Sequence, residues 1–295
     1  ILMAGVNSLS NSKIIDRYGN EKPITHNKQV LAADIDNDGN IYYGHKYGYV
    51  RKFNFESNQE IFYAKKHNED VYCVSVDTVN GYFYSGSLDN TVRKYDTTTG
   101  NEITNNWPFT GNSGAVYGIA ADPVNGYVYS VGSYGYLRKI NANTGNEVTS
   151  DNWPVKANNG AISSVTVDKN GYIYSVFDSL IHKFDPSTGS KIWSSNSSNY
   201  PVSVAVDNNG YAYVGTTNST VHKYSVTDGT EITSGGWPFD KHTGGVRNIA
   251  AAVDGTVYTG SRDDTVKKIN SDGTEAWTYT GFNENITAVA VGIIY

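Results

Sequence analysis

Gly81-Tyr-Phe-Tyr84 and its copies decide the fold. The segment recurs as Gly126-Tyr-Val-Tyr129, Gly171-Tyr-Ile-Tyr174 and Gly210-Tyr-Ala-Tyr213, with weaker copies at 39–42 and 255–258. The final tyrosines of successive copies are 42, 45, 45, 39 and 45 residues apart. A unit of about 40–45 residues is the length of one four-stranded blade of a β-propeller.

Each copy lies in the same series of apolar runs and turns. An apolar run such as Val71–Val76 predicts the innermost strand, A, and an Asn-Gly or Asp-Gly pair follows it in every unit. These pairs favour two-residue hairpin turns, because both central residues of such a turn need a positive φ. Strand B is then expected over 82–86, strand C over 91–95 and strand D over 101–104.

We therefore expect an all-β fold, a single β-propeller domain over 1–295 with seven four-stranded blades. Complete units start near residues 30, 71, 116, 161, 201 and 246. Segments 1–29 and 286–295 would share a closing blade, which removes the open sheet edges that favour aggregation. Both 1–5 and 292–295 fit strand B of that blade. A six-bladed ring with an extra terminal strand is the alternative.

Two stretches resemble the B–C segment of WD40 repeats: Ser85–Asp96 (SGSLDNTVRKYD) and Thr259–Asn270 (TGSRDDTVKKIN). The Gly-His dipeptide usual in that family is absent, and Tyr-Asp replaces its Trp-Asp. Asp185–Trp193 (DPSTGSKIW) resembles a PQQ-like propeller repeat, and 272–277 is a shortened relative. Both resemblances imply a propeller.

The PQQ-like resemblance implies no cofactor here. Quinoprotein enzymes of that class often carry an adjacent cysteine pair, whereas Cys73 is the only cysteine of this chain. We expect Cys73 to be a buried, unreactive thiol. The Asn-, Tyr- and Thr-rich texture of the repeats is also similar to propellers of bacterial surface proteins and phage tail proteins.

Charge and hydropathy exclude two classes of partner. The net charge of −6 is spread along the chain, which argues against a nucleic-acid partner, because such a partner requires a basic face. No apolar run approaches the roughly 20 residues needed to cross a bilayer. We therefore expect no membrane insertion.

Three D–A connections share a Trp-Pro pair, at Trp107, Trp153 and Trp237. Each tryptophan follows Asn or Gly, which places it in a polar loop near the rim. Rigid aromatic faces beside amides suit sugar stacking or contact with a partner. The alternative is that these tryptophans wedge between adjacent blades.

The B–C connections contain Tyr47, Tyr134 and Arg262. Exposed tyrosine and arginine are enriched at binding hot spots, so these three are candidate ligand-binding residues. Ordinary loop tips are the alternative.

Asp34, Asp36 and Asp38, followed by Gly39, resemble the start of a calcium-binding loop. Calcium prefers oxygen ligands at alternating positions, but such loops end on a glutamate where this chain has His45. Asp36 and Asp38 also fall where other units carry Asp168 and Asn170 of a hairpin turn. The pattern therefore favours the turn, with calcium as the alternative.

Strand C carries a cation at one repeated position, which the WD40-like register places against a neighbouring blade: Arg17, Lys52, Lys94, Lys139, Lys183, Lys223 and Lys268. We expect each stem to pack on apolar surface while its head reaches solvent or a carboxylate. A ring of cations that binds an anion is the alternative. His182 and His222 stand where other units carry arginine, which indicates a surface role.

No hydrolase elbow, zinc-protease motif or phosphate loop is present, and we expect no enzyme. The favoured function is an extracellular or virion-associated module that binds a cell-surface glycan or a protein through its D–A and B–C loops. The alternatives are a ligand-free structural platform in a larger assembly such as a phage tail, an intracellular WD40-like scaffold, and a lyase or hydrolase acting on the axis.

Overall fold

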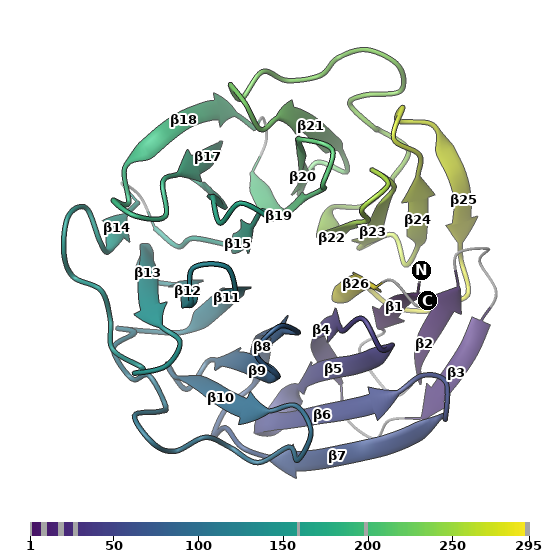
Figure 1. The fold of residues 1–295 in the computed structure, drawn as a ribbon. Helices are drawn as coiled ribbons and strands as arrows, with labels where there is room; N and C mark the ends of the chain where they lie inside the picture. The colour runs from purple at the N-terminus through teal and green to yellow at the C-terminus, as the bar shows by residue number, and fades with distance from the viewer. Residues whose placement is uncertain are drawn as a thin grey trace.

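The structure is a computed structural model of the 295-residue chain. It describes residues 2–6, 11–16, 21–25, 29–157, 160–197 and 200–292. Among these residues, no helix has the length and apolarity that a membrane-spanning segment needs. The strands group into antiparallel sheets arranged around a central axis (Figure 1). The prediction of an all-β propeller is confirmed.

In the described part of the chain, the strands form seven sheets, six of which are built from consecutive strands. The first of these six holds β4 (Val30–Ile35), β5 (Asn40–His45), β6 (Tyr49–Asn54) and β7 (Gln59–Lys65), with the short 3-10 helix η1 (Lys46–Gly48) between β5 and β6. The second holds β8 (Val71–Asp77), β9 (Tyr82–Ser87) and β10 (Val92–Asp96). The third holds β11 (Val116–Asp122), β12 (Tyr127–Gly132), β13 (Tyr136–Asn141) and β14 (Val155–Lys156).

The next three sheets repeat this order. They are β15 (Ser164–Val167), β16 (Ile173–Phe177), β17 (Leu180–Phe184) and β18 (Lys191–Asn196); β19 (Pro201–Val206), β20 (Tyr211–Thr216) and β21 (Val221–Ser225); and β22 (Val246–Ala251), β23 (Val257–Ser261), β24 (Val266–Ile269) and β25 (Glu275–Tyr279).

The remaining sheet joins both ends of the chain. Its order is β26 (Ala288–Gly292), β1 (Leu2–Val6), β2 (Asn11–Asp16) and β3 (Glu21–Thr25). β1 pairs antiparallel with β26, Ala4 opposite Ala290. The strand-B place beside β26 is therefore taken by β1, while residues 293–295 lie outside the described residues.

Apolar side chains fill the space between adjacent sheets and hold the ring together. One cluster joins Tyr42 and Val50 of the β4–β7 sheet to Val74 and Phe83 of the β8–β10 sheet. Equivalent clusters lie at each further junction, including the one where Ala288 of β26 meets Ile35 of β4. Burial of this apolar surface is the main force that holds such a ring closed.

The lysines of strand C add a polar contact at five of these junctions. Lys94 Nζ donates to the carbonyl oxygen of Ala142 in the next sheet at 2.8 Å and lies 3.6 Å from the centroid of the Tyr82 ring. The same cross-sheet bond is made by Lys52, Lys139, Lys183 and Lys223. The position faces the neighbouring sheet, as the WD40-like register predicted, but these five heads bond to backbone carbonyls of that sheet, and none of the five forms an ion pair with a described carboxylate. Arg17 lies outside the described residues.

Candidate functional site

A β-bulge near the start of the innermost strand recurs in five sheets. In β22 the pairing passes from Val246 directly to Asn248, so Arg247 has no partner in the ladder. The equivalent unpaired residues in the other four sheets are Leu31, Tyr72, Tyr117 and Val202. A bulge bends the strand locally and redirects the side chain of the extra residue, and bulges are common beside binding sites.

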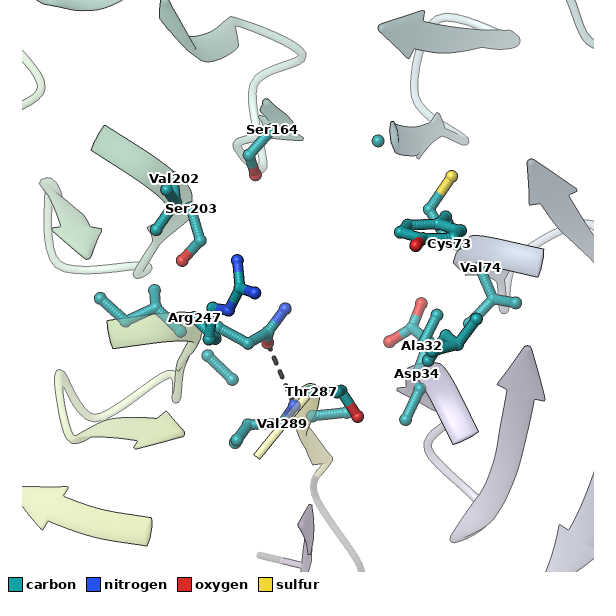
Figure 2. A pocket seen from close by; sticks show the side chains of 18 of the residues that line it. Ala32, Asp34, Cys73, Val74, Ser164, Val202, Ser203, Arg247, Thr287 and Val289 are labelled. Carbon is teal, nitrogen blue, oxygen red and sulfur yellow. Dashed lines mark hydrogen bonds between the residues drawn. The ribbon is translucent and has the colours of Figure 1, made fainter. Parts of the chain in front are cut away.

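All five bulge residues line one cavity on the propeller axis. This channel has a volume of about 1200 Å³, and the innermost strands β4, β8, β11, β15, β19, β22 and β26 contribute its walls. Figure 2 shows some of the side chains that line it, with the guanidinium of Arg247 directed into the open centre. The bulges therefore build the mouth of the channel on the face formed by the D–A and B–C connections.

Two arginines lie together at this mouth. Arg247 comes from the bulge of β22, and Arg262 comes from the B–C loop of the same sheet. Burial lowers the pKa of Arg247, and the nearby positive charge of Arg262 lowers it further. The structure thus places the predicted candidate Arg262 beside an arginine that the sequence analysis did not single out.

The opposite side of the channel mouth is aromatic. The rings of Tyr72 and Tyr117, from neighbouring sheets, have centroids 6.1 Å apart. The Tyr72 phenol also influences the Arg247 guanidinium electrostatically, although their strands lie three sheets apart around the ring. Long side chains therefore reach toward each other across the mouth.

Below this mouth, Asp34 is an acidic group of the channel wall. Its carboxylate accepts hydrogen bonds from the backbone N–H groups of Val76, at 2.8 Å, and Ile35, at 2.9 Å. Burial raises the pKa of Asp34 to about 6, and the two backbone bonds act against that rise. The bond to Val76 crosses to the next sheet, so Asp34 joins two innermost strands.

The five exposed large aromatic residues of the described chain all lie on the D–A and B–C face. Tyr47 and Tyr134, two predicted candidates, stand on B–C loops with 60% and 64% of their surface exposed. Tyr200 stands on a D–A connection at 72% exposure, and the bulge residues Tyr72 and Tyr117 are 41% and 36% exposed. The opposite face instead exposes single valines on its A–B turns: Val79, Val124 and Val253.

The three Trp-Pro tryptophans do not lie on this face, and their prediction as stacking residues is wrong. Trp107, Trp153 and Trp237 are each only 4% exposed. Their rings lie 5.4–5.6 Å from buried tyrosines of strand B. Gly145 and Gly189 of the following sheets pack directly against Trp107 and Trp153. The tryptophans therefore wedge between blades, which was the alternative interpretation.

The reason is an interrupted strand D. Only isolated bridges, Tyr95 with Glu102 and Val92 with Phe109, occupy the fourth position of the β8–β10 sheet. The predicted strand at 101–104 is thus reduced to one bridge, and the Trp107 segment between the two bridges is not part of a strand. A cis peptide bond joins each of the three tryptophans to its proline.

The calcium candidates do not converge. Asp36 accepts bonds from the backbone and side-chain amides of Asn40 and from the Tyr42 hydroxyl, at 2.8–2.9 Å. Asp34 instead faces the channel, as described above. Asp168 and Asp207 accept the equivalent tyrosine hydroxyl in their own turns. The set Asp34, Asp36 and Asp38 is therefore a hairpin turn with an adjacent inter-blade contact, and calcium binding there is not supported.

The prediction of a surface role for His182 and His222 is also wrong. Both residues are buried. His222 Nδ1 bonds to Glu231 at 2.7 Å, in place of the Arg93–Glu102 pair of another sheet. His182 stacks on Phe177 with ring centroids 4.0 Å apart, and burial lowers its pKa to about 4. These histidines serve the interior of their sheets.

Two further histidines, which the sequence analysis passed over, form buried networks. His67 Nδ1 lies 2.9 Å from Asp89, and its Nε2 lies 2.6 Å from the hydroxyl of Ser85, which is hydrogen-bonded to Tyr95. The other set joins His242, Asp263 and Thr259, with distances of 2.8 and 2.7 Å. Each histidine ends a D–A connection and fixes a B–C loop. The spacing of 17 or 18 residues to Ser85 and Thr259 was the signal that could have found them.

The distances in these networks match those of a Ser–His–Asp triad, but the hydroxyl groups are not accessible to a substrate. Ser85 and Thr259 are fully buried, so no substrate reaches either hydroxyl. Burial lowers the pKa of both histidines, although hydrogen bonds to their aspartates act in the other direction. Burial raises the pKa of Asp263, but bonds from Thr265, Thr243 and His242 outweigh this and hold it at about 2. The lowered pKa of the histidine and the lowered pKa of its aspartate both fit a neutral histidine that donates a hydrogen bond to an ionised carboxylate.

Cys73 is buried, and burial raises the pKa of its thiol well above its usual range. A thiol with this environment is a poor nucleophile. The residue packs in the cluster between the β8–β10 and β11–β14 sheets.

Comparisons with known proteins agree with this architecture. Residues 177–291 match the family described as outer membrane protein assembly factor BamB, of the PQQ type, and residues 57–96 match the WD domain, G-beta repeat. Comparison with curated protein sequences found no significant match. The solved structure entitled "Structure of U3-55K" superposes with a TM-score of 0.75 at 14% identity, covering 91% of this chain and 86% of that one. The chain is a β-propeller built from repeats of the WD40 and PQQ-like kinds.

Proposed function

We propose that this chain is a non-enzymatic binding module that engages a protein partner through the face carrying its D–A and B–C connections. The observation that carries the proposal is the placement of every exposed large aromatic of the described residues on that face. Tyrosine supplies a large, rigid contact area at low entropic cost and is enriched at binding hot spots. The match of residues 57–96 to WD40 repeats supports a protein as the partner, because such propellers commonly mediate protein interactions.

The proposal takes the sheet β26-β1-β2-β3 as the seventh blade, so that the binding face is a closed ring of loops. It places the module outside the cell or on a virion surface, because its Asn-, Tyr- and Thr-rich repeats are similar in texture to propellers of bacterial surface and phage tail proteins. A cell-surface glycan is the competing ligand, since exposed tyrosine rings also stack on sugars. The burial of Ser85 and Thr259 supports a role without catalysis.

The test compares two triple variants on opposite faces. The rim variant Tyr47→Ser/Tyr134→Ser/Tyr200→Ser removes three exposed rings from the proposed face. The control variant Val79→Ser/Val124→Ser/Val253→Ser changes three exposed apolar side chains on the other face. Both variants should keep the wild-type unfolding temperature within a few degrees, because exposed side chains contribute little to stability.

Peptides selected from a displayed random library, and a glycan array, supply the ligands. We expect selected peptides to bind the rim variant at least about tenfold more weakly than the control variant, since hot-spot tyrosines contribute about 1 kcal/mol or more each. If glycans bind the control variant but bind the rim variant at least about tenfold more weakly, the ligand of this face is a sugar and not a protein. If the selected ligands bind the rim variant as tightly as the wild-type chain, or no longer bind the control variant, the assignment of binding to this face is wrong.

A further inference from the structure

The charge environment of the arginines separates two of them from the rest. Of the five arginines in the described residues, three pair with a glutamate nine residues later in the chain: Arg51 with Glu60, Arg93 with Glu102 and Arg138 with Glu147. Arg247 and Arg262 make neither an ion pair nor a side-chain hydrogen bond within the described chain. Both of these unpaired arginines line the channel.

Their proximity has an energetic consequence. Val246 pairs with Ser261, and the backbone N–H of Arg262 bonds to the carbonyl oxygen of Gly245 at 3.0 Å, so Arg247 and Arg262 stand at neighbouring positions of β22 and its B–C loop. Burial lowers the pKa of Arg247, and the positive charge of Arg262 lowers it further, so the two charges repel each other. Two like charges in a partly desolvated site destabilise one another. An anion bound between them would remove that repulsion and add charge-assisted hydrogen bonds, which are about twice as strong as neutral ones.

The surrounding polar groups favour an anion over a cation at this mouth. Lys46 also lines the channel, as do the acidic residues Asp34, Asp264 and Glu284, but no ion pair within the described chain joins any of these carboxylates to Arg247 or Arg262. Asn248 Oδ1 accepts the backbone N–H of Val289 at 3.1 Å, so the NH₂ end of its amide is left to donate. Figure 2 shows the Arg247 guanidinium directed away from the wall and into the open channel. In a chain of net charge −6, this is a local concentration of donors.

We propose that Arg247 and Arg262 bind an oxyanion, a carboxylate or phosphate group, that enters the channel from the tyrosine-bearing face. The planar guanidinium fork matches the oxygens of both groups. Tyr72, across the channel, closes the site on its other side. The oxyanion belongs either to a free small molecule or to the partner of the binding face; this second source rests on the proposed function, whereas the first does not.

The test titrates inorganic phosphate and citrate into the purified chain by calorimetry at low ionic strength, where charge interactions are least screened. We expect saturable binding at one site. Arg247→Gln and Arg262→Gln should each weaken it at least about tenfold, because each removes charged hydrogen bonds to the anion. The matched control is Lys169→Gln, which removes an exposed cation from an A–B turn on the opposite face and should leave the affinity unchanged.

A second readout does not depend on any ligand. Without anion, Arg262→Gln should keep or slightly raise the unfolding temperature, because it removes a repulsion and no native contact. The wild-type chain should gain stability on addition of phosphate or citrate, and the arginine variants should not. A clear loss of stability in Arg262→Gln without anion would show that the arginine has a structural role and would overturn the proposal.

Peptides with a free C-terminal carboxylate, compared with their amidated forms, identify the source. Preference for the free carboxylate that is lost in Arg247→Gln assigns the oxyanion to a partner. Binding of phosphate or citrate alone assigns it to a small molecule. Absence of both kinds of binding, or equal weakening by Lys169→Gln, overturns the oxyanion site. The rim-tyrosine variant tests the proposed function separately, since it leaves both arginines in place.

Discussion

Replacing His242 by leucine tests whether the buried networks hold the B–C loops. His242 Nδ1 donates to Asp263 at 2.8 Å, and its Nε2 accepts from the Thr259 hydroxyl at 2.7 Å. The bond to a carboxylate contributes about 1.5–3 kcal/mol, and the bond from the hydroxyl about 1 kcal/mol. Because both partners stay buried after His242→Leu, we expect a loss of about 3 kcal/mol in the free energy of unfolding.

The assay is urea unfolding at pH 7.5, followed by fluorescence of the buried tryptophans. Thr259→Val serves as the matched variant, because it removes only the neutral bond and should cost about 1 kcal/mol. The double variant should lose less than the sum of the two single losses, since both changes remove the same bond. A loss below about 1 kcal/mol for His242→Leu, or strict additivity, would refute the structural role of the network.

Two further predictions concern pH and the inter-blade lysines. Burial lowers the pKa of His67 and His242, so their contribution to stability is complete above the unfolded histidine pKa, about 6.5, and is lost as the pH falls below it; unfolding between pH 7.5 and 5 should show this loss, and a rise in stability toward pH 5 would contradict it. Lys94→Met keeps the apolar stem but removes the bond to Ala142 and the contact with the Tyr82 ring. We therefore expect urea unfolding to show a loss of about 2 kcal/mol in the free energy of unfolding. An unchanged urea midpoint would contradict this prediction.

The repeating parts of the fold could be predicted from the sequence, because each one is local. The Asn80–Gly81 turn and the Tyr84 strand follow from hairpin chemistry and strand propensity, and the same signals recur in each unit. The position of Lys94 against a neighbouring blade followed from its repeated register. Those features depend on residues within one unit.

What the sequence did not indicate depends on residues that are distant in the chain. Trp107 looked like a polar loop residue, since nothing nearby shows that Gly145 of the next sheet leaves space for its ring. His67 is not preceded by glycine, so the Gly-His dipeptide of WD40 repeats does not mark it, and only its spacing to Ser85 indicates the network. Arg247 became a candidate only when the pairing of β22 with β23 showed the bulge at its position.

The five bulges have a consequence for how this surface can change. Leu31, Tyr72, Tyr117, Val202 and Arg247 occupy equivalent places, yet they are aliphatic, aromatic or cationic. Each is skipped by the hydrogen-bonded ladder and lines the channel, so we expect substitution there to leave the sheet register unaltered. Specificity at the channel mouth is thereby uncoupled from the scaffold. A combinatorial library confined to these five positions would vary recognition while sparing the fold.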